Sequence, residues 1–553
     1  MGITSFYFLL FFVITVAVYY TVPLLFKGKG QWVVLLLASI SYYLLSGNGV
    51  LILYPLFASF ATWGLLKILK RISDEQKNVT DAANTGDATA SNKQIDVTVK
   101  RRMVLGLELA CLLGILIFLK YTKLIHGGSI ATPLGLSFYT FILLGYFIEV
   151  YNGLAEGDES FLKTALIGMY FPVMISGPIF QIRETGKQFF ERHKLDYKNI
   201  TFGAQRMLWG FFKELVISER LAVVVNTIYN NDTEYPGAYI MLGTVGFALQ
   251  LYTNFSGCMD IVIGASECFG IILPENFTTP FFAKNISEYW RRWHITLGVW
   301  MRENVFYPLL RSKMIMNLGK FLKGKLGKKK GKQCTTYVAM FILWFSVGLW
   351  HGGEMKYVIG SGLLHWAYIV IGEITLPFFT WLFGEKMKIN MKGRFADCVR
   401  VVRTFILVCI GDLFFRADNV PHALRMLKES VSTFNPQIFV DGSLLNLGID
   451  IVDWGIVVVS LVILACVSVM QYRMENGKTG TTAKKADADK DSKENDAKNL
   501  KKSISDYSNV REFIADRPVV LRWCIYIAFL FFVILIAEYG PGYSAAEFIY
   551  KDF

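Results

Sequence analysis

The chain has 553 residues, of which 53% are hydrophobic and 15% aromatic, and its mean hydropathy is +0.40. Apolar runs close to the ~20 residues that span a bilayer recur along it, and this excludes a soluble protein. The formal net charge of +13 is concentrated in short stretches beside these runs, so it indicates cytoplasmic flanks rather than nucleic-acid binding.

The N-terminal third predicts paired membrane spans. Residues 5–26 lack the basic start and small-residue cleavage site of a removed signal peptide, so we expect a retained first span. Residues 31–45 and 50–66 form the next two predicted spans around a short glycine-rich turn. Basic residues follow the first and third spans, and the positive-inside rule therefore places Met1 outside the cell.

Two polar segments stand out between the apolar runs, at residues 72–98 and 474–506. Both are rich in charged and small polar residues and poor in aromatic ones. Such segments bury too little apolar surface to fold on their own. We therefore expect two flexible cytoplasmic loops.

The remaining apolar runs bring the expected total to about eleven to thirteen membrane segments. The runs are continuous rather than strictly alternating, and backbone groups in lipid must be paired internally, so helices are favoured over barrel strands. No internal repeat or pair of matching broken helices of the transporter type is present. The prediction is an all-α polytopic integral membrane protein, with residues 1–553 as a single membrane domain.

The stretch 287–308 has the most unusual composition, with three tryptophans, three arginines and one histidine. Ser287 suits a helix start, and Trp290 and Trp293 would then share a face. Arginine at a bilayer centre costs at least ~2.5–3.5 kcal/mol, so these side chains need a headgroup zone or a wet cavity. An interfacial amphipathic helix is one interpretation; His294 within the stretch favours a functional site.

His351 is the strongest candidate for chemistry. It follows an apolar run, 337–350, and precedes Gly352 and Gly353, which allow a sharp turn beside the imidazole. An ionisable residue at membrane depth is a functional candidate, and neutral histidine suits proton removal from a hydroxyl. A second histidine, His365, follows in another apolar run, and we expect it to be a packing residue.

Other site classes are not indicated. The sequence has no Gly-x-Ser-x-Gly elbow, no His-Glu-x-x-His zinc motif, and eight scattered cysteines without a Cys-x-x-Cys pair, so no metal site is predicted. Asn254, Ser256 and Asp260 form a polar cluster after an apolar run. They could orient an imidazole, bind a substrate hydroxyl or cap the following helix.

Six ordered motifs, all within residues 135–366, carry a resemblance to a known family. They are Gly-Leu-Ser-Phe-Tyr-Thr from 135, Ser-Gly-Pro from 176, Asn-Phe-Ser-Gly from 254, Leu-Pro-Glu-Asn-Phe from 273, Tyr-Trp-Arg-Arg-Trp-His from 289 and Gly-Leu-Trp-His-Gly from 348. With the end of the chain at 547–550, they make the sequence similar to the membrane-bound O-acyltransferases (MBOAT), in the bacterial branch of alginate O-acetyltransferase and the teichoic-acid D-alanyl transfer protein.

The resemblance implies a ring of helices and re-entrant segments around a central funnel, with 135–366 as the catalytic core. It further implies that His351 is catalytic and that His294 is the second catalytic residue. The substrate-binding residues expected around them are Trp290, Arg291, Arg292, Trp293, Asn254, Ser256, Asp260, Arg302 and Trp350. Arg291 and Arg292 would face the phosphates of the acyl donor or anchor the re-entrant segment.

The expected activity is transfer of a short acyl group, acetyl first of all, to hydroxyls of a cell-surface polysaccharide. A thioester, either acyl-CoA or an acyl-carrier phosphopantetheine, would be co-substrate, with no tightly bound cofactor. D-alanyl transfer to teichoic acid is one alternative, and a polysaccharide or lipid transporter is another. The expected partners are a donor or donor carrier in the cytoplasm, a polysaccharide or acyl-relay protein outside, and membrane lipids, but no nucleic acid. The expected location is the bacterial cytoplasmic membrane.

Overall fold

The computed structural model describes residues 1–25, 30–84, 90–126, 131–157, 160–487 and 504–538. These residues form helices joined by turns and short extended segments, and they contain no β-strand beyond an isolated β-bridge between Phe277 and Trp293. The all-α fold class is therefore confirmed. The C-terminal segment 547–550, part of the sequence resemblance, lies outside the described residues.

The helices of the first half of the chain are α1 (Phe6–Leu25), α2 (Gln31–Tyr43), α3 (Leu53–Asn84), α4 (Ala90–His126), α5 (Leu136–Tyr151), α6 (Phe161–Met169), α7 (Phe171–Met174), α8 (Ile182–Thr185), α9 (Tyr197–Phe211), α10 (Glu219–Asn230) and α11 (Ala238–Cys268). A π-helical segment, η4 (Phe212–Ser218), joins α9 to α10.

The helices of the second half are α12 (Ile286–Arg292), α13 (Ile295–Met301), α14 (Tyr307–Leu310), α15 (Lys313–Leu326), α16 (Lys328–Trp350), α17 (Met355–Tyr357), α18 (Leu364–Phe379), α19 (Arg394–Arg416), α20 (Val420–Ser432), α21 (Ile451–Asp487), α22 (Val510–Ala515) and α23 (Val519–Ile536). Two further π-helical segments matter below, η6 (Arg302–Phe306) after α13 and η7 (Val358–Leu363) before α18.

Six helical stretches among the described residues are long and apolar enough to cross a membrane: Gly49–Asp81, Asn92–Thr122, Lys328–Trp350, Met355–Lys386, Ile451–Gly477 and Val519–Ile536. Three shorter apolar helices accompany them, at Phe6–Thr21, Gln31–Gly47 and Leu136–Tyr151. The chain is thus a multi-pass membrane protein. The expected eleven to thirteen segments and the outside position of Met1 stay predictions.

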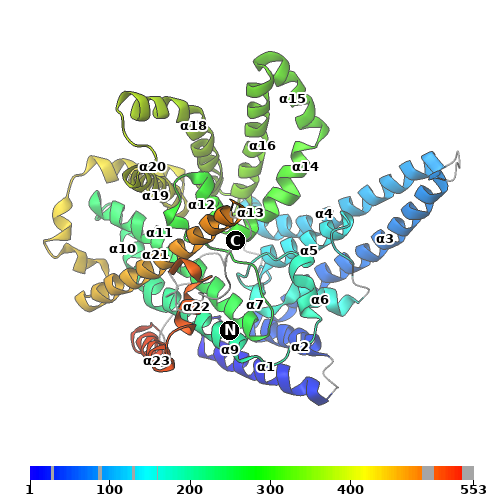
Figure 1. Cartoon of the computed structure of the whole chain (residues 1–553), viewed down its shortest axis with the longest axis horizontal. Helices are drawn as coiled ribbons and strands as arrows, with labels where there is room; N and C mark the ends of the chain where they lie inside the picture. Colours follow the sequence, from blue (N-terminus) through cyan, green and yellow to red (C-terminus); the bar gives the residue numbers. More distant parts are fainter. Residues whose placement is uncertain (26–29, 85–89, 127–130, 158–159, 488–503, 539–553) are drawn as a thin grey trace.

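Several arms extend from a central group of helices that includes α11, α12 and α13 (Figure 1). One arm is the α3–α4 hairpin, another is formed by α14, α15 and α16, and a third by α18. The helices that enter the site below, α12, α16, α18 and α19, meet at the inner ends of these arms.

The expected loop at 72–98 is wrong, because residues 72–84 continue α3 and residues 90–98 belong to α4; residues 85–89 lie outside the described residues. The two helices pack along each other and bury Ile72, Val79 and Val97. Lys100 pairs with Glu75 across the hairpin, at 3.3 Å between Nζ and Oε1. The few apolar residues of this polar segment fall on one face. Such a face is sufficient to stabilise a helix when a partner helix covers it.

The second expected loop, 474–506, is wrong in its first part, because α21 continues to Asp487. Residues 504–506 form a short 3₁₀ turn, and residues 488–503 lie outside the described residues. Met474 is fully buried, and Glu475 is ion-paired, so the beginning of this segment belongs to the packed protein. The polar composition of residues 474–487 predicted a loop, but these residues extend the apolar helix that precedes them.

Helices α9 and α11 approach each other closely along a line of glycines. A Cβ on Gly203 would lie 2.5 Å from the carbonyl oxygen of Gly264, and one on Gly210 would lie 2.6 Å from that of Gly257. Small residues allow such backbone contact, which is the usual way for membrane helices to associate. The glycine of the Asn-Phe-Ser-Gly motif therefore serves helix packing.

Candidate functional site

The Trp/Arg stretch is two short helices rather than one. The side chain of Asn285, not Ser287, caps α12 by accepting the backbone N–H of Glu288 at 2.8 Å. The helix ends at Arg292, Trp293 is extended, and His294 has a left-handed backbone with φ of 46° before α13 begins. The expected single helix is therefore wrong, because the chain turns at Trp293 and His294, although Trp290 and Trp293 both line the cavity described below.

Asn276 holds this turn. Its side-chain oxygen Oδ1 accepts hydrogen bonds from the backbone N–H of Thr296 at 3.1 Å and from the Thr296 hydroxyl at 2.9 Å. The same oxygen lies 3.2 Å from Nδ1 of His294, which therefore donates. A non-glycine residue with positive φ is sparsely populated and persists where its surroundings determine it. The neutral His294 ring so placed carries its lone pair on Nε2.

His351 ends α16 and is 3% exposed. Gly352 and Gly353 follow with φ of 146° and 77°, so the chain turns away at once, as the sequence predicted. The imidazole packs against Trp350 and Phe415, with ring centroids 4.8 Å and 5.6 Å away. The amino group of Lys120 donates to the carbonyl of Trp350 at this end of the helix.

The two histidines of the prediction both contact one tryptophan. The Trp350 ring is 6.1 Å from the His294 ring and 4.8 Å from the His351 ring, centroid to centroid. Trp350 also packs on Phe141, at 5.9 Å. His294 and His351 are both buried, and the fold brings them together although 56 positions stand between them in the sequence.

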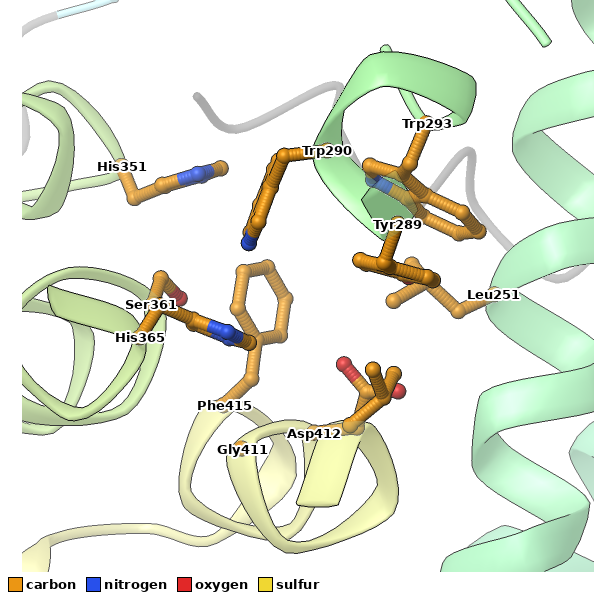
Figure 2. A pocket seen from close by; sticks show the side chains of 11 residues that line it. Leu251, Tyr289, Trp290, Trp293, His351, Ser361, His365, Gly411, Asp412 and Phe415 are labelled. Carbon is orange, nitrogen blue, oxygen red and sulfur yellow. The ribbon is translucent and has the colours of Figure 1, made fainter. Parts of the chain in front are cut away.

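A small cavity adjoins His351. We call it the histidine cavity; its lining residues are Leu251, Tyr289, Trp290, Trp293, His351, Ser361, His365, Val408, Gly411, Asp412 and Phe415. Figure 2 shows His351 and His365 entering from one side, Trp290 between them and Tyr289, and Asp412 from below. His294 is not among the lining residues.

Close packing of small residues holds three walls of the histidine cavity together. A Cβ on Gly348 of α16 would lie 2.7 Å from Cα of Val358, and one on Gly362 would lie 2.6 Å from the carbonyl oxygen of Trp344. A Cβ on Gly411 of α19 would lie 2.9 Å from Nε2 of His365. Glycines at these positions let α16, η7, α18 and α19 approach closely enough for both imidazoles to share one cavity.

His365 was expected to be a packing residue, but it lines the same cavity as His351. It is 4% exposed, its ring lies 5.0 Å from Trp290 at 89°, and it stacks at 5.8 Å on Trp344. The sequence analysis also missed Asp412 and Ser361. Asp412 carried a usable signal, because it is the only acidic or basic residue besides Arg403 in the apolar run 401–415.

Asn254, Ser256 and Asp260 lie away from the histidine cavity, in the middle of the continuous helix α11, so none of them caps a helix. Asp260 accepts from Lys213 at 2.6 Å and from Arg206 at 2.9 Å. Ser256 accepts from Lys213 at 2.8 Å, and Asn254 donates to Glu214 at 2.8 Å. We call Arg206, Lys213, Ser256 and Asp260 the α9–α11 charge network. These contacts join α11 to α9 and η4.

Arg291 and Arg292 line a different hollow, together with Thr278, Glu288 and Glu475, which we call the charged cleft. Arg292 donates to Glu288 and Glu475, each at 3.1 Å, and so ties α12 to α21. Arg291 is exposed. Arg302 begins η6 and is exposed, outside both hollows. Of the predicted substrate-binding residues, the structure therefore brings Trp290 and Trp293 into the histidine cavity and places Trp350 beside it.

Residues 157–408 match the family model described as MBOAT, membrane-bound O-acyltransferase family. This part of the chain belongs to that family. The MBOAT segment contains His294, His351 and His365 and ends four residues before Asp412.

Three curated relatives show the range of the likeness. The protein named "Probable alginate O-acetylase AlgI" of Pseudomonas syringae pv. tomato is 32% identical over 295 residues, 53% of this chain and 51% of the relative. The peptidoglycan O-acetyltransferase of Helicobacter pylori is 28% identical over 369 residues, which cover 60% of this chain and 65% of the relative. The teichoic acid D-alanyltransferase of Bacillus subtilis is 27% identical over 295 residues, which cover 52% of this chain and 70% of the relative. The chain thus spans about half the length of the alginate O-acetylase relatives that it matches.

No group of three histidine, cysteine, aspartate or glutamate side chains within the described ranges could hold a metal ion. The polar groups at the cavity include the imidazoles, the indole N–H groups and the carboxylate of Asp412.

Proposed function

We propose that this chain is an O-acyltransferase that moves a short acyl group, acetyl first of all, onto hydroxyls of a cell-surface polysaccharide. The observation that carries the proposal is the burial of His351 and His294 against Trp350, within an MBOAT segment. A buried neutral imidazole can remove the proton of an attacking hydroxyl and return it to the leaving group.

The chemical steps in this proposal use the chain's own groups. His351 accepts the proton of the acceptor hydroxyl while its oxygen attacks the thioester carbonyl. The resulting oxyanion is placed to accept a hydrogen bond from the indole N–H of Trp290, whose Nε1 is buried and makes no hydrogen bond to any described residue. The oxyanion then collapses, the thiolate leaves, and the proton held by His351 passes to it.

The proposed donor is a thioester, either acyl-CoA or an acyl-carrier phosphopantetheine, delivered from the cytoplasm. The proposed acceptor is a polysaccharide or an acyl-relay protein on the outer side of the bacterial cytoplasmic membrane. The names of the relatives support this assignment, because they give alginate, peptidoglycan and teichoic acid as the modified polymers. Membrane lipids surround the spanning helices in this proposal.

D-alanyl transfer to teichoic acid is the second candidate function. The observation that favours it is the alignment with the Bacillus subtilis protein, which covers 70% of that relative's length. The same imidazole chemistry would serve both acyl groups, so the donor decides between the two functions.

The test uses purified protein in nanodiscs with labelled acetyl and D-alanyl thioesters and with alginate, peptidoglycan fragments and lipoteichoic acid as acceptors. We expect acetyl transfer by the wild type and a loss of ~10²–10⁴-fold in His351→Ala, the usual contribution of a general base. His422→Ala is the matched control, because His422 lies beside Asp232 and Asp418, outside the cavity. Wild-type protein that transfers neither acyl group to any acceptor would overturn the proposal.

A further inference from the structure

A strongly charged surface lies around the turn between α15 and α16, outside the histidine cavity. Residues 304–353 contain no acidic residue, whereas residues 313–332 contain eight lysines. All eight are exposed, and none is used by the acyl-transfer steps above. We call them the lysine surface; they are Lys313, Lys320, Lys323, Lys325, Lys328, Lys329, Lys330 and Lys332.

The lysine surface has no counter-charge within the described part of the protein. None of its side chains makes a hydrogen bond or a salt bridge to a described residue. The two acidic residues that border the acid-free stretch have partners elsewhere. Glu303 pairs with Arg183 at 3.0 Å, and Glu354 lies 3.7 Å from Lys356. Because like charges repel each other, such a surface is stabilised by anions from outside the chain.

Close helix packing concentrates this positive charge. A Cβ on Gly331 of α16 would lie 2.5 Å from the backbone nitrogen of Lys323 on α15, and Gly327 turns the chain between the two helices with φ of 80°. The two helices lie side by side in one of the arms of the molecule (Figure 1). Residues 328–330, all lysines, form the first turn of α16, where positive charge opposes the helix dipole. The sequence thus places cations where the helix itself does not favour them.

The position of these lysines along α16 indicates the membrane surface. Helix α16 is long and apolar enough to span a membrane, and four of its first five residues are lysines. Its 23 residues give a length of about 34 Å, compared with ~30 Å for the hydrocarbon core of a bilayer. A charged side chain inside that core is costly, so the lysines lie at the level of the lipid headgroups.

The exposed side of α15 has the pattern of a helix that lies at a membrane interface. Met314 and Phe321 are 61% and 60% exposed, and they share a face because they are seven residues apart. Lys313 and Lys320 share the neighbouring face, and Nζ of Lys325 lies 6.0 Å from the centre of the Phe321 ring. Interfacial helices combine apolar side chains that enter the bilayer with lysines that reach the headgroups. This combination, at the end of a spanning helix, favours a lipid surface over an acidic protein.

We propose that the lysine surface, together with Met314 and Phe321, is a binding site for anionic phospholipids. The lipid phosphates neutralise the lysines, and the acyl chains cover the two apolar side chains. Lysine is a point charge on a flexible stem, and it suits mobile headgroups better than the fixed geometry of an arginine pair does. The attraction of such lysines to an anionic surface is electrostatic and decreases with salt. The inference does not depend on the acyl donor or acceptor of the proposed function.

The test measures which lipids stay bound to the full-length protein, by native mass spectrometry after purification in micelles with equal amounts of phosphatidylglycerol and phosphatidylcholine. The test variant combines Lys328→Gln, Lys329→Gln and Lys330→Gln, and the matched control places arginine at the same three positions. We expect the glutamine variant to lower the ratio of bound phosphatidylglycerol to phosphatidylcholine by about fivefold or more, the contribution of a single lysine near an anionic surface. The arginine variant should keep the wild-type ratio.

Unfolding temperatures supply an independent readout. Phosphatidylglycerol added to protein in phosphatidylcholine micelles should raise the unfolding temperature of the wild type and the arginine variant more than that of the glutamine variant. In phosphatidylcholine alone, the glutamine variant should be at least as stable as the wild type, because it has lost charge that opposes the helix dipole.

Equal retention of the two lipids by the wild type, or an unchanged ratio in the glutamine variant, would overturn the inference. An unchanged ratio together with weaker binding of an acidic carrier protein would assign the lysine surface to that partner instead. Neither readout uses acyl transfer, so a protein that transfers no acyl group would overturn the proposed function and leave the lipid site in place.

Discussion

The α9–α11 charge network and the histidine cavity are both polar regions inside an apolar protein, yet they are built differently. In the network, Lys213, Arg206 and Asp260 are joined by contacts of 2.6 and 2.9 Å, and Ser256 completes the partners of Lys213. At the cavity, Asp412, Nδ1 of His365 and Nε1 of Trp290 make no hydrogen bond to described residues. Buried polar groups are normally paired, so the contrast separates a region that holds helices together from one prepared for a ligand.

The contrast also revises the expected roles of the Asn-Phe-Ser-Gly motif and of the arginine pair. Both are rich in groups that could bind a substrate, but the structure pairs most of them within the protein. Asp260 holds two cations, and Arg292 bridges two carboxylates. The comparison therefore predicts that changes in the network and at Arg292 lower stability, whereas changes at the cavity lower the rate of transfer.

The largest effect on stability is expected from Asp260→Ala. Removing one partner of a buried ion pair leaves Lys213 and Arg206 without their shared carboxylate, which should lower the free energy of unfolding by ~3–5 kcal/mol. The measurement is unfolding in detergent, with transfer assayed per folded molecule and expected to stay near wild type. The double variant Lys213→Met with Asp260→Leu should regain much of the stability. A stable Asp260→Ala protein that has lost transfer would place Asp260 at the site.

A smaller effect is expected from Gly411→Ala, because the new methyl group would lie 2.9 Å from Nε2 of His365. Overpacking of this kind costs ~1–3 kcal/mol, and moving the His365 ring should also slow transfer. Gly372→Ala on α18 is the control, since a Cβ there meets nothing within 4 Å. Calorimetry measures the stability of the two variants, and the transfer assay measures their rates. Equal behaviour of the two variants would show that the α19 wall does not position His365.

The smallest effect on stability is expected in the charged cleft, where the two arginines should differ. Arg292→Ala loses hydrogen-bonded ion pairs to Glu288 and Glu475 and should lower the free energy of unfolding by about 1–2 kcal/mol. Arg291 is exposed, so Arg291→Ala should change stability by less than about 0.5 kcal/mol. Donor titration of both variants shows whether the cleft binds phosphate. A raised donor KM in Arg291→Ala alone would restore part of the expected donor-facing role.

The features that the sequence predicted well are local ones. Long apolar runs identified spanning helices, and an imidazole at the end of the run 337–350 identified His351, because both signals are present in adjacent residues. His294, expected as the second catalytic residue, is buried against Trp350, but its backbone was not foreseen. Its turn depends on Asn276, eighteen positions away, and no local pattern reports that contact.

The features that were missed depend on packing between distant segments. The polar residues of 72–84 and 90–98 are helical because α3 and α4 cover each other's few apolar side chains. His365 enters the cavity because Gly411 lets α19 approach it. Asp412 is different, since a carboxylate inside an apolar run is a visible signal, and applying the rule used for His351 to it would have found it.

The most direct test of the central claim, that the histidine cavity is the reaction centre, is a structure of the protein with a non-hydrolysable acyl thioester analogue. The account predicts that the carbonyl oxygen of the analogue accepts the Trp290 N–H at about 2.7–3.1 Å, with His351 beside the carbonyl carbon. An analogue whose acyl group lies in the charged cleft at Arg291, with the histidine cavity unchanged, would contradict it.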